Sequence, residues 1–577
     1  MYDLLIKSGT IVDGTRFPRY VADIAIKDGR IAHIGHVDPE TARETLDAEG
    51  LIIAPGHIDC HTHYDAQIHW DPYCSNSGEN GITTVVTGNC GFGFAPCRSA
   101  DRERYMRMME NTEQVPYVQM KAALPWTWET FPEWFDHLKG LPKGVNMMMY
   151  VPLNPLLIYV MGVDAAKTER PGPSDLEEMK RLIREAMDCG ACGIALSHLG
   201  EHNTHVDWDG TPMPTDLMHR DDAIALASVL RERDSGTIQL LSLLPGAFDE
   251  RDLACDLYDA SGRPVILNVF TTSNMMPGMA KEGLAWLAGV NAAGKRIYGQ
   301  TLAQRGWSEF NLVDFNLNDH LPEWAAISKL KSLDEKFALL RDEQHRALMK
   351  ERYDPMLLMA GSGALDALTV TSVNDVDALA AYVSRTLGDI AAEEDKHPLD
   401  VLFDICLESE GWADFRTPPL AGSDPAENSE LISGPNMLAG TSDGGAHSKF
   451  FIGGHWPTEL LVTLGKEHNL LSLEELHYRF SWQPARVMGL TDRGALLEGM
   501  AADIIIYDFD ALATGGTQYE IRHDMPAGDW RRYLATTGYR WIIVNGELTF
   551  EDGKPSGGLP GEILRNNLPV SATDVVA

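Results

Sequence analysis

The feature that most restricts the fold of this chain is a long alternation of short apolar runs and helical segments. The apolar runs have the length of buried strands and occur at 83–88, 192–197, 237–241 and 264–269. Between two of them, Ser174 suits a helix N-cap and Gly190 suits the residue after the last turn. Because strand–helix repeats build parallel sheets, this pattern predicts an α/β fold. A repeat this long indicates a (β/α)8 barrel, whose functional residues lie at the carboxyl ends of its strands.

Both ends of the chain show a different pattern, of short strands joined by tight turns. Asp28-Gly29 and Asn545-Gly546 each separate apolar runs, which is a strong hairpin signal. We therefore expect the two termini to build one small β-sandwich. The expected parts are the sandwich at 1–55 and 491–577, the barrel at 56–490, and an insertion in the barrel at about 306–364.

Composition excludes several kinds of function. The 577 residues carry a formal net charge of −36, which argues against nucleic acid or an anionic membrane surface as a partner. No apolar run reaches the ~18 residues of a membrane-spanning helix, and the first residues lack the basic and apolar regions of a signal peptide. The eight cysteines are scattered, so we expect reduced thiols in a cytoplasmic protein. Cys189 and Cys192 have CxxC spacing, but no second pair follows and they stand at the end of a helical segment, which favours a structural role over a redox or zinc site.

His61 and His63 stand at the end of an apolar run, 51–60, that is typical of a buried strand. Side chains two positions apart on a strand point to the same face, so the two imidazoles are expected to lie side by side. Two buried histidines without partners cost free energy, whereas two imidazoles on one face are a ready pair of metal ligands. The sequence therefore predicts a metal site at this strand end.

Further polar residues follow other predicted strands. Cys90 lies between glycines, and its thiol suits a zinc ligand and a buried apolar group equally well. Asp443-Gly444 ends an apolar run, which suits a carboxylate at the mouth of a barrel and is also an ordinary turn. Three histidines lie within eight residues, in one predicted loop: His198, His202 and His205. They are compatible with metal ligation and equally with an ordinary solvated loop.

Six segments carry a family pattern, in the correct order along nearly the whole chain: 8–14, 55–65, 81–91, 441–444, 484–486 and 499–503. Together they resemble the amidohydrolase superfamily, in the branch that contains the N-acyl-D-amino-acid deacylases. The resemblance implies a metal-bearing (β/α)8 barrel with a β-sandwich made from both termini. This agrees with the fold expected from the strand and helix patterns.

The resemblance also implies roles for individual positions. His61 and His63 match the metal ligands of the first strand, and Cys90 matches a cysteine that ligates zinc in this branch. Asp443 matches the aspartate of the last strand, a metal-site residue that acts as general base and then as general acid. Candidates for hydrogen bonds to the metal ligands or to substrate are His447, Tyr64, Asn268 and His205.

The chain departs from the family pattern at two strands. The deacylases carry a histidine on the fifth strand and another on the sixth, whereas 237–243 has none and 264–270 offers Asn268. His198 stands at the end of the fourth strand, where many members of the superfamily have a metal-bridging lysine. Either a loop histidine, His198 among them, replaces a missing ligand, or four residues hold the metal alone: His61, His63, Cys90 and Asp443.

The expected function is that of a zinc-dependent amidohydrolase, with one or two Zn²⁺ ions, that deacylates an N-acyl amino acid or a related amide. The ion would acidify a water molecule, and Asp443 would accept its proton during attack on the amide carbonyl. The alternatives are a hydrolase of cyclic amides, lactones or other esters, and a catalytically impaired barrel that acts as a binding protein. The expected partners are a small-molecule substrate and further copies of the chain, without nucleic acid or membrane.

Overall fold

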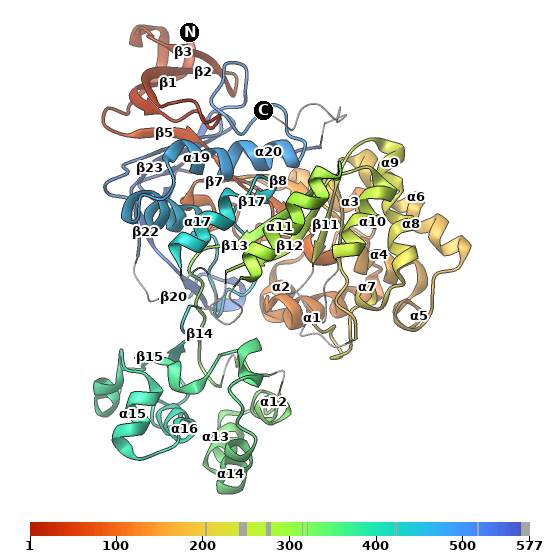
Figure 1. The fold of residues 1–577 in the computed structure, drawn as a ribbon, viewed down its shortest axis with the longest axis vertical. Coiled ribbons are helices and arrows are strands. Elements are labelled where there is room, and N and C mark those ends of the chain that lie inside the picture. The colour runs from red at the N-terminus through yellow and green to blue at the C-terminus, as the bar shows by residue number, and fades with distance from the viewer. Residues whose placement is uncertain are drawn as a thin grey trace.

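The structure is a computed structural model, and it describes residues 1–201, 205–241, 251–272, 278–313, 316–319, 321–419, 422, 424–515 and 519–566. Figure 1 shows three regions: a sheet that contains the N-terminus, a central region of strands and covering helices, and a separate lobe. The polar strand ends described above belong to the central region.

Parallel strands form the central region, in two sheets. One sheet has six strands, in the order β17 (Met437–Leu438), β13 (Ile297–Leu302), β12 (Val265–Thr271), β11 (Thr237–Leu241), β10 (Gly193–Ser197) and β9 (Val151–Pro152). The other has three, in the order β6 (His57–Asp59), β7 (Ile82–Thr87) and β8 (Asn146–Met149). Neighbouring strands are parallel throughout, so their carboxyl ends meet at the same edge.

The two parallel sheets approach each other at both sides. Only Tyr150 separates β8 from β9 along the chain. At the other side, a parallel bridge joins Thr62, beyond β6, to Gly444, beyond β17. Residues that follow the first and the last of these strands therefore lie next to each other.

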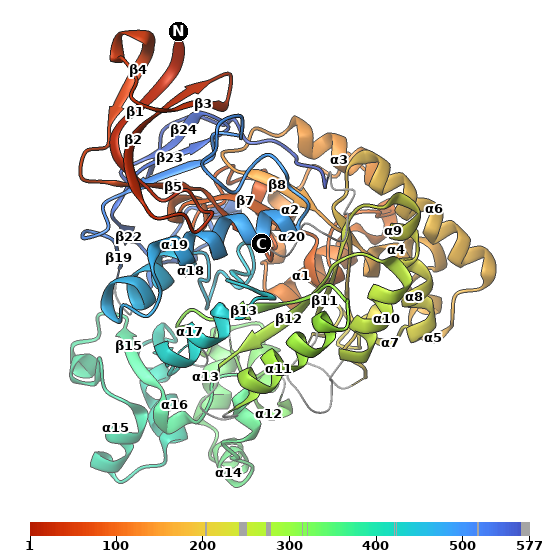
Figure 2. The same cartoon turned by 45° about the horizontal axis from the view of Figure 1, so that its top comes forward.

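Helices cover the strands, as α6 (Pro173–Cys189), α8 (Arg220–Ala227), α10 (Arg251–Ser261) and α11 (Met279–Ala292) illustrate in Figures 1 and 2. Helix α6 begins one residue before the expected cap, because Pro173 takes the first helical position. Its buried face repeats at helical spacing through Met179, Leu182, Ile183 and Ala186. Among the described residues, no helix combines the length and the apolarity needed to cross a membrane.

Strands from both chain ends share one nine-stranded sheet. The N-terminal group is β1 (Tyr2–Ile11), β2 (Tyr20–Lys27), β3 (Arg30–Gly35), β4 (Ala42–Asp47) and β5 (Ile52–Pro55). The C-terminal group is β18 (Ile504–Tyr507), β23 (Tyr539–Val544), β24 (Glu547–Glu551) and β25 (Lys554–Pro555). The groups meet where β5 pairs antiparallel with β18. Both predicted hairpin turns are confirmed, and Asp28 and Asn545 have the positive φ, 50° and 46°, that such turns require.

A separate lobe spans residues 309–416 and is drawn in green and teal at the bottom of Figure 1. It contains the sheet β14 (Glu309–Phe310), β16 (Ala413–Arg416) and β15 (Thr369–Val373), and the helices α12 (Pro322–Ser328), α13 (Leu333–Arg341), α14 (Glu343–Glu351), α15 (Leu387–Glu394) and α16 (Pro398–Glu408). Its apolar residues form their own core. Because β14 pairs with β16, the chain enters and leaves the lobe at adjacent strands.

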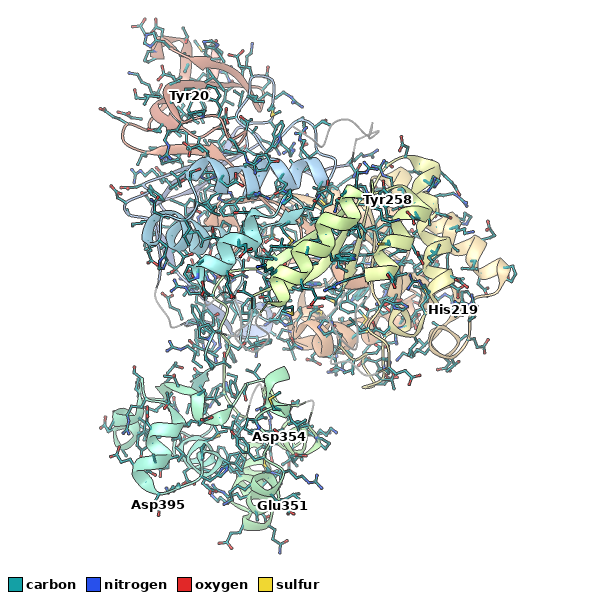
Figure 3. The ribbon with its side chains drawn as sticks, in the orientation of Figure 1. Tyr20, His219, Tyr258, Glu351, Asp354 and Asp395 are labelled. Carbon is teal, nitrogen blue, oxygen red and sulfur yellow. The ribbon has the colours of Figure 1, made fainter. Side chains whose placement is uncertain are left out.

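The insertion expected at about 306–364 covers only the first part of this lobe. The second part contains α15 and α16, whose lengths and apolar spacing are also typical of helices that cover a parallel sheet. Helices of an inserted lobe and helices that cover a barrel sheet have the same apolar spacing, because both bury one face against a core. The lobe carries acidic residues such as Glu351, Asp354 and Asp395, which are labelled in Figure 3.

Candidate metal centre

His61 and His63 follow strand β6 and project together, as the strand period predicts. Between them, the Thr62 hydroxyl donates to the Val86 carbonyl at 2.7 Å, and the His63 N–H donates to the Gly444 carbonyl at 2.7 Å. These bonds hold the chain extended between its neighbours on both sides. The two buried rings consequently lie close together, with their centroids 5.4 Å apart.

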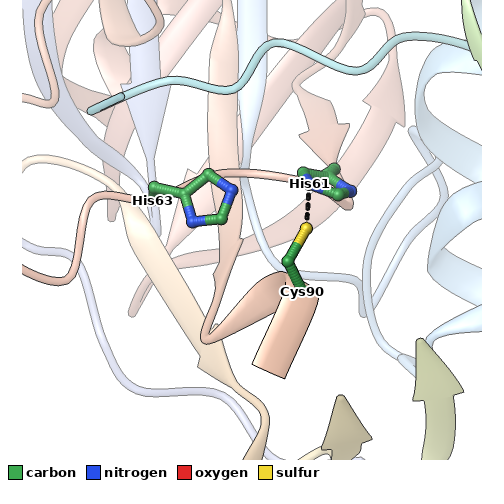
Figure 4. Close-up of side chains that lie close together, drawn as sticks. All are labelled: His61, His63 and Cys90. Carbon is green, nitrogen blue, oxygen red and sulfur yellow. Dashed lines mark hydrogen bonds between the residues drawn. The ribbon is translucent and has the colours of Figure 1, made fainter. Parts of the chain in front are cut away.

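Cys90 brings its thiol to the same place from the end of β7. Its Sγ lies 3.4 Å from His61 Nε2, and the ligand atoms of His61, His63 and Cys90 all lie within 4.8 Å of one another (Figure 4). The Cys90 N–H donates to Gln239 Oε1 at 2.6 Å, which fixes the turn that carries the thiol. Burial raises the pKa of the Cys90 thiol well above its ordinary value. The thiolate form therefore needs a cation beside it.

Asp443 lies opposite this group, on the loop after β17. Its Oδ1 is 3.3 Å from His61 Nε2 and 3.8 Å from His63 Nε2. Its side chain is 26% exposed, whereas those of His61 and His63 are 2% and 1% exposed, so the site opens on the Asp443 side. Its deep position, together with the charge of Asp59, raises the pKa of Asp443 to about 7. A carboxyl group with this pKa can exchange a proton near neutral pH.

Glu113 is a site residue that the sequence did not indicate. It is the last residue of α1 (Arg102–Glu113), and its side chain is 2% exposed. Its Oε1 lies 3.6 Å from His63 Nε2, and its Oε2 lies 3.5 Å from His447 Nε2. Burial, with the charge of Asp443, raises the pKa of Glu113 well above its ordinary value. No spacing rule marks Glu113, because the contact depends on how α1 packs over the strand ends.

Two of the expected histidines also lie near the site. The Nδ1 atom of His447 is hydrogen-bonded to Gln114 Oε1. His205 packs against Phe92, with the ring centroids 6.1 Å apart, and its Nδ1 is buried without a hydrogen-bond partner. Burial lowers the pKa of His447 to about 3 and that of His205 to about 4. Both imidazoles are therefore neutral at pH 7 when no ion is bound.

Asn268 belongs to a chain of buried amides that crosses strands β11, β12 and β13. Gln239 Nε2 donates to Asn268 Oδ1 at 3.1 Å, and Asn268 Nδ2 donates to Gln300 Oε1 at 3.0 Å. At one end of this row of amides, Gln239 accepts the Cys90 N–H. At the other end, Gln300 Nε2 donates to the Gly440 carbonyl at 2.9 Å. Every amide in it has partners, so these groups hold the backbone around the site. Gln239 and Asn268 thus occupy strands where the deacylase pattern has histidines.

His198 and Tyr64, both expected at the site, face elsewhere. His198 Nε2 lies 3.0 Å from the Met218 carbonyl, because the chain turns toward α7 (Pro214–Leu217) after β10. The structure does not bring His198 into the group of possible metal ligands. His202 lies outside the described residues.

Tyr64 is fully buried beneath the Asp443 loop rather than in contact with the site. Its hydroxyl donates to Ser77 Oγ at 2.7 Å. A Cβ atom at Gly444 would lie 2.6 Å from the Tyr64 ring, so the ring supports the loop from below. Its hydroxyl is already bonded and points away from His61 and His63.

The donor atoms of the site fit a divalent metal ion. The atoms that face one another across the site are Nε2 of His61, Nε2 of His63 and Sγ of Cys90. Oε1 of Glu113, which faces His63 Nε2, is buried without a hydrogen-bond partner. Burial lowers the pKa of His61 to about 3 and that of His63 well below its ordinary value, which keeps both rings in the neutral form that binds metals. Imidazole, thiol and carboxylate donors together are typical of zinc.

The charge of the site also favours a divalent metal ion. Within the described part of the chain, the ion pairs of Glu113 and Asp443 are with histidines alone. The stretches outside the described ranges contain neither Lys nor Arg. The buried carboxylate of Glu113 and the half-buried one of Asp443 therefore face no basic side chain, and a divalent cation would balance them.

Three comparisons with known proteins agree with one another. The pattern described as "Amidohydrolase family" matches residues 44–213. An uncharacterized protein of Mycobacterium tuberculosis (strain ATCC 25618 / H37Rv) is 27% identical over 530 residues, which are 88% of this chain and 84% of that protein. The N-acyl-D-glutamate deacylase of Alcaligenes xylosoxydans xylosoxydans is 25% identical over 573 residues, which are 99% of this chain and 98% of that protein.

A solved structure has the same fold. The N-acyl-D-glutamate deacylase from Bordetella bronchiseptica, complexed with zinc and a phosphonate inhibitor, has a TM-score of 0.63 at 22% identity. The match covers 98% of this chain and 99% of that chain.

Fold and site together define an α/β protein with a candidate metal centre at the carboxyl ends of parallel strands. The matched segment 44–213 contains His61, His63 and Cys90, the three residues that could hold the metal. Residues 44–213 match the amidohydrolase family, and the chain is similar over nearly its whole length to an N-acyl-D-amino-acid deacylase, so the resemblance found in the sequence is confirmed.

Proposed function

We propose that this protein is a metal-dependent hydrolase that cleaves a C–N amide bond and deacylates an N-acyl amino acid or a related amide. The observation that carries the proposal is the group of His61, His63 and Cys90, with Asp443 on its open side. The deacylases among its relatives support the reaction, and the zinc complex of one of them supports zinc as the metal.

The residues of the site would divide the work. His61, His63 and Cys90 would hold one or two Zn²⁺ ions, which acidify a water molecule and polarise a carbonyl group when bound. Asp443 Oδ1, 3.3 Å from His61 Nε2, would accept the proton of the attacking water and then donate it to the leaving nitrogen. His205, which packs against Phe92 near the site, would contact substrate and help to exclude other water.

We also propose a closed (β/α)8 barrel with a β-sandwich built from both termini. Counted with β8 and β9 as one strand, the two parallel sheets supply the eight strands that a barrel needs. The bridge between Thr62 and Gly444 supports closure at the remaining side. The proposed parts are 1–55 and 491–577 for the sandwich and 56–490 for the barrel, with the lobe as its insertion.

The proposed setting is the cytoplasm, with a homo-oligomer that acts on a small-molecule substrate. All eight cysteines are free, and most of them are buried. Free thiols persist in a reducing compartment, which supports the cytoplasm.

The test separates metal binding from catalysis. Purified wild-type protein is assayed for metal by elemental analysis, and for turnover on N-acyl amino acids, cyclic amides, lactones and esters. Asp443→Asn should keep the metal content of the wild type and lower turnover by ~10²–10⁴-fold. Asp508→Asn, beyond β18 in the terminal sheet, serves as a control and should retain both.

The outcomes distinguish the candidate functions. Full turnover by Asp443→Asn would remove the assignment of the base. Preference for a cyclic amide or an ester over linear amides would favour the second kind of hydrolase. Bound metal without turnover on any substrate would favour a binding protein, and wild-type protein without metal would refute metal dependence.

A further inference from the structure

Gln114 fixes the orientation of the His447 ring. Its Nε2 donates to the Asn111 carbonyl at 3.0 Å, so its Oε1 is the atom that faces His447 Nδ1. An amide oxygen only accepts hydrogen bonds, and Nδ1 therefore carries a proton. A metal-binding histidine is commonly held in this way, by a carbonyl oxygen that accepts the proton of the other ring nitrogen. His447 Nε2 is left as the atom that faces Glu113.

The distances around Glu113 are too long for hydrogen bonds. His63 Nε2 lies 3.6 Å from Oε1, and His447 Nε2 lies 3.5 Å from Oε2. An N–H···O bond has a length of about 2.7–3.2 Å. Two ligand atoms that are each about 2.1 Å from one tetrahedral ion lie about 3.4 Å from each other. The separations thus match those of groups that share a cation.

The carboxylate of Glu113 lies between the two histidines, at a helix end whose backbone is fixed. Gln114 ends α1 in a left-handed conformation, with a φ of 49°. The His447 N–H donates to the Glu113 carbonyl at 2.7 Å, which ties the end of the helix to the Asp443 loop. Oε1 of Glu113 is buried without a hydrogen-bond partner. A positioned, buried and unsatisfied carboxylate is costly unless a cation completes it.

We propose that Glu113 and His447 are protein ligands of a divalent cation. His63, which also belongs to the group with His61 and Cys90, is a further ligand that they have in common with that group. This inference rests on the proposed metal dependence of the site. It adds a carboxylate from a helix end and an imidazole from the Asp443 loop to ligands that follow β6 and β7. Zinc, or another first-row divalent ion, suits such a set of oxygen and nitrogen donors.

The experiment compares two buried glutamates in the full-length chain. Glu113→Gln removes the charge at nearly constant shape. Glu79→Gln is the matched control, because Glu79 is also buried and its Oε1 accepts the Asn76 N–H at 2.9 Å, away from the site. The Zn²⁺ affinity and the number of ions per chain are measured on metal-stripped protein by competition with a chromogenic chelator.

We expect Glu113→Gln to bind zinc ~10–100-fold more weakly than wild type, or to lose one ion per chain, while Glu79→Gln binds as wild type does. Glu113→Asp, which keeps the charge but shortens the side chain, should fall between them and replaces Glu113→Gln if that variant does not fold. The metal-free Glu113→Gln protein should melt at the wild-type temperature or above it, because an unpaired buried charge is gone.

Two results overturn the inference. One is a zinc affinity and stoichiometry of Glu113→Gln equal to those of wild type. The other is equal weakening in Glu79→Gln, which would make the effect non-specific. Wild-type protein that binds no divalent ion would refute the proposed function itself, whereas normal binding by wild type and Glu113→Gln alike would refute this inference alone.

Discussion

At the scale of single residues, three parts of the site stand in an uncommon backbone conformation. Cys90, Asp443 and His447 have φ angles of 57°, 49° and 55°, in the left-handed region that residues other than glycine seldom adopt. Each such residue costs about 1 kcal/mol or more, and the surrounding structure has to impose it. Because of these conformations, the side chains of Cys90, Asp443 and His447 project from the strand ends in directions that an extended backbone would not allow.

Cys90 should be more important for metal binding than for the fold. Cys90→Ser replaces a soft thiolate by a hydroxyl group and should weaken Zn²⁺ binding by at least ~10-fold. Cys97→Ser is the control, because Cys97 is equally buried and its thiol bonds the Arg98 carbonyl. The measurement is chelator competition on metal-stripped protein, and equal affinities of the two variants would contradict the role of Cys90.

Local pattern was sufficient for some site residues and not for others. His61 and His63 could be predicted, because a strand repeats every two residues. The place of Asp443 after an apolar run made it a candidate only, and the family resemblance supplied its expected role. Glu113 could not, since its role depends on the direction in which α1 packs, and His198 has the right type of side chain but follows a strand whose loop turns away.

At the scale of elements, a buried ion network joins the lobe to the C-terminal segment. Arg532 on β21 (Arg531–Tyr533) lies 3.2 Å from Glu309 Oε2 on β14 and 2.5 Å from Asp414 Oδ1 on β16. One guanidinium thus serves two carboxylates at the base of the lobe. Burial, which exceeds the effect of Arg532, raises the pKa of Glu309 to about 7, and the charge of Asp414 adds to the rise.

Glu309 should make the protein less stable as the pH rises from about 4.5 to about 7. An unfolded chain releases this proton near pH ~4.3, whereas the folded protein holds it to about pH 7. Acid therefore favours the folded state between these values, and that contribution is lost above the upper one. Glu309→Gln should flatten this part of the profile by up to ~3–4 kcal/mol, as measured by urea unfolding at several pH values. Identical profiles for variant and wild type would show that Glu309 does not titrate in this range.

At the scale of the whole molecule, the chain is strongly acidic and its site faces no basic side chain. The formal net charge is −36. The carboxylates Glu113 and Asp443 form ion pairs only with histidines among the described residues. A substrate that carries its own carboxylate would find no basic side chain paired with these two residues, so only the bound metal or backbone N–H groups could receive that carboxylate.

Substrates without a free carboxylate should therefore be preferred. An N-acyl amino acid amide should be hydrolysed with a kcat/KM at least ~10-fold above that of the same compound with a free carboxylate, because the free acid would lose its hydration in the site without gaining a basic side chain as partner. The measurement is a comparison of matched pairs at fixed ionic strength. A higher kcat/KM for the free acids would mean that the bound metal or a backbone group recognises the carboxylate.

Removal of the metal should lower the melting temperature of the entire protein. An ion that binds only the folded state adds about 2.7 kcal/mol of stability at 100 times its Kd. Dialysis against a chelator should therefore reduce the melting temperature by a few degrees, and zinc should restore it. Calorimetry provides the measurement, and the same melting temperature with and without chelator would argue against a metal in the folded wild-type protein.

The pairing of β5 with β18 has a consequence for synthesis. Strand β5 ends at residue 55 and its partner begins at residue 504. At ~5–20 residues per second, a ribosome delivers the second strand ~20–90 s after the first. During that interval the early strand presents an open edge to every neighbouring nascent chain. Polypeptides that terminate prematurely keep this edge permanently, and such fragments should be found in aggregates.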